Sequence, residues 1–211
     1  MGLMISRFVL SAVALATAAF GQYKTEPAGA PPADLAPAVA QTLEKSGTRI
    51  TGPSGVVCEI WFRAQTPGGA KTADENVTMK SVPAGALLGA IRFPGRGFDR
   101  RGQQLKSGVY TLRYGWIPVN GDHQGAAPQR DFLVMVQAAE DKDPTATSTF
   151  EALMALSKKA SGTPHPAVLS FWKQDTDFQP GISKQGESDW VFQTKLGDTQ
   201  IAVIVVGTAS S

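Results

Sequence analysis

Short apolar segments with a period of two residues dominate this chain and constrain its fold more than any other feature. A period of two places alternate side chains on opposite faces of an extended strand, whereas a helix needs a period of about 3.6. In one segment, Tyr110, Leu112 and Tyr114 face one way while Thr111 and Arg113 face the other. Segments of this kind, each bounded by Gly, Pro, Asn, Asp or Ser, occupy residues 48–51, 55–63, 87–93, 109–117, 131–137, 167–173, 190–196 and 199–206.

Two helices are predicted beside these strands. Ser148 and Glu151 are spaced as in a capping box, in which both side chains satisfy free backbone N–H groups at a helix start. Apolar residues then recur at helical spacing up to Gly162, a typical helix end. A shorter helix is expected after Asp34, where apolar residues recur every four positions at Leu35, Val39 and Leu43.

These elements predict a mainly β chain. The expected fold is an antiparallel β-sandwich of about eight strands, with one medial helix and a short N-terminal helix. An open barrel is the alternative. The last strand, 199–206, is apolar on both faces, which predicts a central place in its sheet.

The first residues have the order of a cleavable secretory signal. Arg7 gives a basic start, residues 8–20 are apolar and uncharged, and the small residues Ala19 and Gly21 precede the expected new N-terminus at Gln22. The apolar stretch is shorter than the roughly 20 residues that span a bilayer. We therefore expect an exported chain, periplasmic or secreted, with a signal peptide in 1–21, a Pro/Ala-rich leader carrying the short helix in 22–46 and one β domain in 47–211.

Charge and cysteine content narrow the range of partners. The formal net charge is +2, so neither nucleic acid nor an anionic membrane is implied. Cys58 is the only cysteine of the chain, which rules out an internal disulfide. Its place among apolar residues in a predicted strand indicates a buried, inert thiol.

The histidines limit the possible metal chemistry, because His123 and His165 are the only two. Together with Asp122 and Asp131 they would supply four ligands that zinc or another divalent metal accepts. One hypothesis is therefore a metal-binding protein or metal-dependent enzyme built on these loop residues. Their spacing matches no known metal motif, and the alternative is that both histidines make ordinary surface hydrogen bonds.

The sequence carries no familiar catalytic motif. It has no Gly-x-Ser-x-Gly elbow, no His-Glu-x-x-His, no phosphate-binding glycine loop and no dinucleotide fingerprint. Paired carboxylates for glycoside hydrolysis stay open, since their separation is set in three dimensions. The pattern favours a non-catalytic binding or accessory module of the cell envelope, whose partner is an envelope protein or a glycan. An adhesion or assembly protein is a further alternative.

One tryptophan and several arginines are the candidate ligand contacts. Trp61 shares the more polar face of its strand with Glu59 and Arg63, which predicts an exposed ring able to stack on a sugar, and a surface pair between the two charges. The charged loop 92–106 suits an anionic glycan or phosphate, although such loops are often simply solvated. The candidate ligand-binding residues are Trp61, Arg100, Arg101 and Arg130.

Several stretches resemble a group of uncharacterised exported bacterial proteins of β-sandwich-like fold. They are Lys106-Ser-Gly-Val-Tyr-Thr-Leu-Arg-Tyr114, Asn120-Gly-Asp-His123, Pro128-Gln-Arg-Asp-Phe132 and the segment from Ala155 to Pro166. The resemblance covers about residues 47–206. It implies no activity, cofactor or catalytic residue. It only draws attention to the polar loop positions beside these stretches, which are His123, Arg130, Asp131 and His165.

Overall fold

A computed structural model describes residues 23–74, 76–117 and 130–209. The predicted signal peptide, Asp122 and His123 lie outside the described residues. The strands are β1 (Lys24–Gly29), β2 (Gly47–Gly52), β3 (Gly55–Phe62), β4 (Leu87–Phe93), β5 (Gly97–Phe98), β6 (Gln104–Leu105), β7 (Gly108–Trp116), β8 (Asp131–Gln137), β9 (Val168–Lys173), β10 (Gly181–Gln185), β11 (Asp189–Leu196) and β12 (Thr199–Val206). The helices are α1 (Pro37–Ala40) and α2 (Phe150–Ser161).

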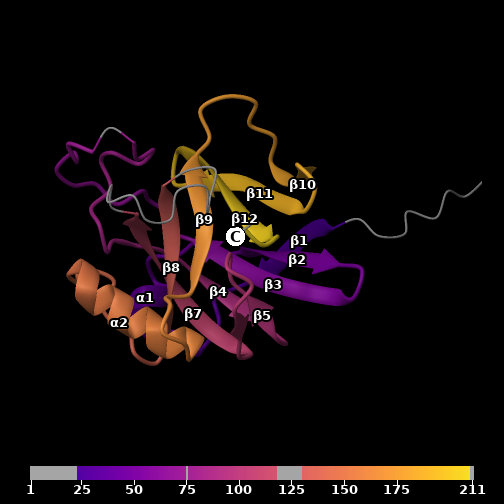
Figure 1. Cartoon of the computed structure of the whole chain (residues 1–211), viewed down its shortest axis with the longest axis horizontal. Helices are drawn as coiled ribbons and strands as arrows, with labels where there is room; N and C mark the ends of the chain where they lie inside the picture. Colours follow the sequence, from indigo (N-terminus) through magenta and orange to yellow (C-terminus); the bar gives the residue numbers. More distant parts are fainter. Residues whose placement is uncertain (1–22, 75, 118–129, 210–211) are drawn as a thin grey trace, which may run out of the picture.

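Ten strands form one antiparallel sheet in the order β1-β2-β3-β4-β7-β8-β9-β12-β11-β10, which curls until it nearly closes into a barrel (Figure 1). The strands β5 and β6 make a separate small hairpin. The predicted mainly β, antiparallel class is confirmed. In place of the expected two packed sheets of eight strands, one continuous sheet encloses the core.

The two edge strands of this sheet, β1 and β10, were not predicted. β1 lies in the leader and pairs with β2 from Lys24 to Gly29, so this part of the leader belongs to the sheet. Pro27 has no backbone N–H to donate, which is tolerated at an edge. Beside the edges, the rings of Tyr23 and Trp190 pack with their centroids 4.5 Å apart and bring β1 and β10 together. The neighbouring ribbons of β1 and β10 are visible at the right of Figure 1.

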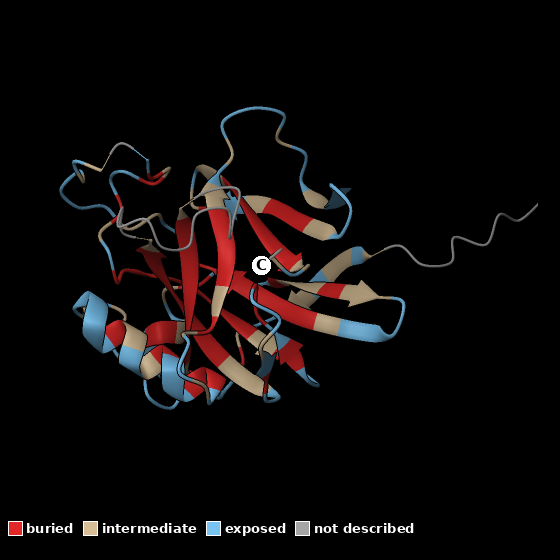
Figure 2. Cartoon of the chain, in the orientation of Figure 1, coloured by how far each residue is buried: buried red, intermediate tan, exposed pale blue. Residues whose placement is uncertain are grey.

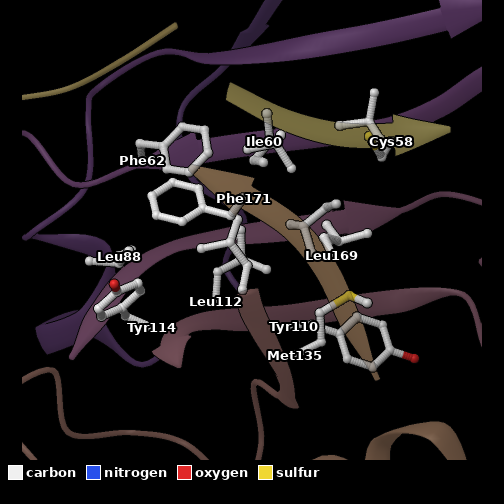
Figure 3. Close-up of a cluster of buried hydrophobic side chains, with 14 of the residues drawn as sticks. Cys58, Ile60, Phe62, Leu88, Tyr110, Leu112, Tyr114, Met135, Leu169 and Phe171 are labelled. Carbon is white, nitrogen blue, oxygen red and sulfur yellow. The ribbon is translucent and has the colours of Figure 1, made fainter. Parts of the chain in front are cut away.

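The inner face of the curled sheet forms the main hydrophobic core. Alternate residues of β3, β7, β8 and β9 meet there, and Figure 3 shows Phe62 and Phe171 side by side among them. Eight-stranded and similar barrels have interiors that side chains can fill. Cys58 belongs to this core, as predicted, and burial raises the pKa of its thiol to about 12.

Helix α2 covers part of the outer face of the sheet, beside β8 (Figure 1). Its buried side packs Leu153 against Val134 and Val136, and Figure 2 shows buried and exposed residues alternating along the helix. The predicted helix is confirmed, including its end at Gly162, whose φ of 68° is left-handed. The predicted cap at Ser148 is wrong by one residue, because the Thr149 hydroxyl accepts the hydrogen bond from the backbone N–H of Ala152.

Helix α1 is shorter than predicted. It has one turn that begins after Ala36, and no side chain caps it, so the predicted cap at Asp34 is wrong. Leu35, Val39 and Leu43 are nevertheless buried together, as their spacing indicated. None of the helices among the described residues is long and apolar enough to cross a membrane.

Candidate functional site

The predicted exposure of Trp61 is wrong. Its side chain points to the outer face of β3, but only 1% of the residue is exposed, because the segment with Leu35 and Val39 covers it. The indole Nε1 donates a hydrogen bond to the carbonyl oxygen of Gly29, 2.8 Å away. Trp61 therefore fastens the N-terminal segment to the sheet and offers no free ring to a ligand.

Glu59 is also buried, and its predicted pairing with Arg63 is wrong. The register places Glu59 directly opposite Arg49 on β2 and Arg92 on β4. Its two carboxylate oxygens accept hydrogen bonds from these two arginines, one from each. Arg63 directly follows β3 and does not pair with Glu59.

Arg100 and Arg101 lie in the β5–β6 hairpin and differ in surroundings. The two terminal nitrogens of Arg100 donate to the carboxylate of Asp189 at 2.6 and 3.0 Å, and the Arg100 side chain is only 8% exposed. The neighbouring Asp99 carboxylate accepts hydrogen bonds from the backbone N–H groups of Arg101 and Gln103, and burial raises its pKa. The structure thus uses Arg100 to hold the hairpin, while the Arg101 side chain is exposed.

Arg130 and Asp131 mark the start of β8. Arg130 donates to the Asp74 carboxylate at 2.6 Å. The Asp131 carboxylate is fully buried and accepts hydrogen bonds from the hydroxyl of Tyr114 and the backbone N–H of Thr78. Burial raises the pKa of Asp131, and the hydrogen bonds offset this only in part.

The structure describes two of the four predicted metal ligands, Asp131 and His165, and does not bring them together. His165 is exposed in the loop after α2. Ala167, two residues later, pairs with Met135, which lies four residues along β8 from Asp131. At about 3.4 Å per residue this is a separation of about 13 Å along the strand. Among the described residues, no three His, Cys, Asp or Glu side chains are grouped as a metal site, and the metal hypothesis stays a prediction.

A hollow of about 400 Å³ lies on the outer face of the C-terminal strands. We call it the Trp172 hollow. The apolar side chains of Val191 on β11 and Ile204 on β12 belong to a small buried cluster against which Trp172 packs. The hollow is lined by Trp172, Gln174, Gln185, Gly186, Asp189, Val191 and Ile204.

Hydrogen bonds fix the orientation of the Trp172 ring. Its Nε1 donates to the side-chain oxygen of Gln174 at 2.7 Å, and the Gln174 amide nitrogen donates to the carbonyl oxygen of Thr176 at 2.6 Å. Asp189, which also lines the hollow, is held by the buried guanidinium of Arg100. The hollow therefore joins a half-buried aromatic ring, an apolar floor and fixed polar groups.

Trp172 was not among the predicted ligand residues, although its strand carries the signal. In strand β9, Ser170 and Trp172 alternate with the core residues Leu169 and Phe171. The same rule that singled out Trp61 thus places Trp172 on a polar face. The two tryptophans differ in what covers them, and alternation carries no information about covering segments.

A comparison of the chain with protein-family models, with curated proteins and with solved structures gave no match. The resemblance to exported bacterial proteins therefore stays a prediction.

Proposed function

We propose that this chain is a non-catalytic, exported binding module of the cell envelope and that it binds glycans in the Trp172 hollow. The observation that carries the proposal is the half-buried Trp172 ring beside an apolar floor and two glutamine side chains. The proposal keeps the sugar-stacking role expected of an exposed tryptophan and moves it from Trp61 to Trp172.

The chemistry of the lining suits a pyranose ring. One face of such a ring presents C–H groups that pack on an aromatic surface, while its rim carries hydroxyl groups. The amides of Gln174 and Gln185 each offer donors and an acceptor, and Asp189 adds carboxylate acceptors. Because Gln174 already holds the indole in place, little side-chain entropy is lost when a sugar binds.

The β5–β6 hairpin extends the proposed specificity toward acidic glycans. Arg100 fastens this hairpin to Asp189, one of the residues that line the hollow. The next residue, Arg101, is exposed, and Phe98 in the same hairpin is 54% exposed. A carboxylate or phosphate on a bound glycan would find its counter-charge in Arg101, which was among the predicted ligand residues.

The test is a calorimetric titration of the purified protein with chitohexaose and cellohexaose, together with co-sedimentation with purified peptidoglycan. We expect at least one of these glycans to bind, and Trp172→Ala to weaken that binding about tenfold or more, the effect of removing a central aromatic contact. Trp116→Ala is the matched control, since Trp116 is also half-buried but is not part of the hollow.

Absence of binding to every glycan would overturn the proposal. Equal binding by the Trp172→Ala variant would move the site elsewhere on the molecule. Thermal unfolding of both variants, followed by circular dichroism, ensures that only folded proteins are compared.

A further inference from the structure

A second hollow, of about 320 Å³, lies where β3 and β4 meet the segment that precedes α2. Three prolines, Ala86 and Leu87 make most of its wall apolar. We call it the Arg63 hollow, after the one charged residue in its lining. It is lined by Arg63, Pro67, Gly68, Pro83, Ala86, Leu87, Pro144, Thr145, Ala146 and Thr147.

Arg63 lacks a partner in the part of the chain that the structure describes. Its Nε is buried and has no hydrogen-bond partner there. Nor does its guanidinium take part in any of the ion pairs between described residues. A buried donor without an acceptor destabilises the fold, and more so when the group is charged. Such a group is a ready site for an acceptor from outside the chain.

The neighbouring Arg113 shows what a fully satisfied guanidinium looks like in this molecule. Its Nε and one Nη donate to the carboxylate of Asp141 at 2.7 and 2.6 Å. The remaining donors bond to the carbonyl oxygens of Gly85, Ala146 and Asp143 at 2.6–2.7 Å. All five N–H groups of an arginine are thereby used. Arg113 has no donor left for a ligand.

The electrostatics of the Arg63 hollow favour an anion. Burial, and secondly the positive charge of Arg113, lower the pKa of the Arg63 guanidinium. Arginine nevertheless stays protonated near neutral pH. Arg63 as a whole is half-buried, so its guanidinium can be reached from outside. The hollow therefore holds one positive charge that no described side chain neutralises, and a bound anion would supply the counter-charge.

We propose that the Arg63 hollow binds a small monocarboxylate with an apolar body. One guanidinium fork matches one carboxylate, with which it forms two parallel hydrogen bonds. A phosphate dianion would need a second cation, and Arg113 already has its counter-charge in Asp141. The prolines and Leu87 offer contact to an apolar group rather than further hydrogen bonds. This site is separate from the Trp172 hollow and does not depend on glycan binding.

Calorimetric titration with sodium benzoate, benzamide and inorganic phosphate tests the assignment. We expect benzoate to bind, benzamide of nearly the same shape not to bind, and phosphate to bind more weakly than benzoate. Added sodium chloride should weaken benzoate binding, because salt screens the ion pair. Arg63→Gln should lose about tenfold or more in benzoate affinity, and Arg63→Lys, which keeps the charge without the fork, should lie between the two.

Arg96→Gln serves as the matched control, because Arg96 is an exposed arginine outside the hollow. It should bind benzoate as the unchanged protein does. Equal benzoate affinity of the Arg63→Gln variant, or no benzoate binding by the unchanged protein, would overturn the proposal. Tighter binding of phosphate than of benzoate would overturn the assignment to a monocarboxylate. Chitohexaose binding should be the same in both variants, which separates this site from the Trp172 hollow.

Discussion

The outer faces of the two halves of the sheet differ in what covers them. Over β3, β4, β7 and β8 lie both helices and the segments that flank them, and charged side chains are buried beneath, among them Glu59, Arg113 and Asp141. The outer face of β12 and β11 instead carries Val191, Ala202 and Ile204, with Trp172 from the end of β9 beside them, and none of these residues packs against a helix of the described chain.

The difference between the two faces shows which hydrogen bonds a covering loop needs. A loop laid over a sheet brings backbone carbonyl groups that neither a helix nor a strand satisfies, and buried carbonyls need donors. Arg113 supplies them, since it bonds to Gly85, Asp143 and Ala146 at once. Over the C-terminal strands, neutral side chains hold the loop after β9, because Gln174 donates to the carbonyl of Thr176 and Gln193 accepts from the backbone N–H of Gln179. Trp172 stays half-buried there.

The largest loss of stability should come from removing the Arg113 side chain, which holds the segment that covers the sheet. Removing one member of a buried ion pair leaves the other charge buried without a partner. Arg113→Ala should therefore lower the free energy of unfolding by about 3–5 kcal/mol. Urea unfolding followed by circular dichroism measures this change. Arg96→Ala, at an exposed arginine, should stay within about 0.5 kcal/mol of the unchanged protein. A loss below about 1 kcal/mol for Arg113→Ala would show that the carbonyl groups find other donors.

A smaller effect is expected at Asp131, an acid buried at the start of β8. Asp131→Asn should lower the free energy of unfolding by about 1–3 kcal/mol near neutral pH, because the new amide N–H₂ group faces the backbone N–H of Thr78. Asp131→Ala gives the comparison in which the hydrogen bonds from the Tyr114 hydroxyl and from the backbone N–H groups of Thr78 and Met79 are all lost.

The Asp131 carboxyl should also leave a signature in the pH dependence of stability. Burial raises the pKa of this group in the folded chain above its unfolded value of about 3.9, so the folded chain binds the proton more tightly. Its contribution to the free energy of unfolding is therefore greatest at acid pH and falls as pH rises through the window between the two pKa values. Urea unfolding at pH 4 to 7 should show this component in the unchanged protein and not in Asp131→Asn. Parallel pH profiles would contradict the assignment.

The smallest effect on stability should come from Trp172, on the outer face of the C-terminal strands. Trp172→Ala removes a half-buried ring that makes no hydrogen bond to the backbone. We therefore expect the free energy of unfolding to fall by about 1 kcal/mol, against about 3–5 kcal/mol for a core tryptophan. Thermal and urea unfolding measure the loss, and Trp172→Phe should restore most of it. A loss as large as that of Arg113→Ala would mean that the hollow is part of the core, and the comparison between the two faces would fail.

Much of the fold follows from alternation in the sequence. The predicted strands from 48–51 to 199–206 all form, and the helix from Phe150 to Ser161 ends at its predicted signal, Gly162, although Thr149 caps it one residue after the predicted cap. The strands β1, β5, β6 and β10 escaped prediction because they are short or polar and lie at edges, where pairing needs no buried face. The single curled sheet depends on long-range contacts such as Tyr23 with Trp190, which no local pattern encodes.

The candidate site was harder to predict than the fold. Alternation identifies the face on which a side chain lies, and it placed Trp61 and Trp172 alike on outer faces. Whether such a face is covered depends on where a distant segment folds back, as the segment with Leu35 does over Trp61. The sequence likewise did not reveal that Arg63 lacks an ion-pair partner. The prediction paired Arg63 with Glu59, whereas the strand register places Glu59 opposite two other arginines.

The contact between Tyr23 and Trp190 also bears on when the chain can fold. It ties the first described residue to one of the last strands, so the sheet closes only after nearly the whole chain has been synthesised. Pairings between distant parts of a chain make folding slow. A polypeptide that folds slowly stays extended long enough to thread through a translocation channel, which suits the export that residues 1–21 predict.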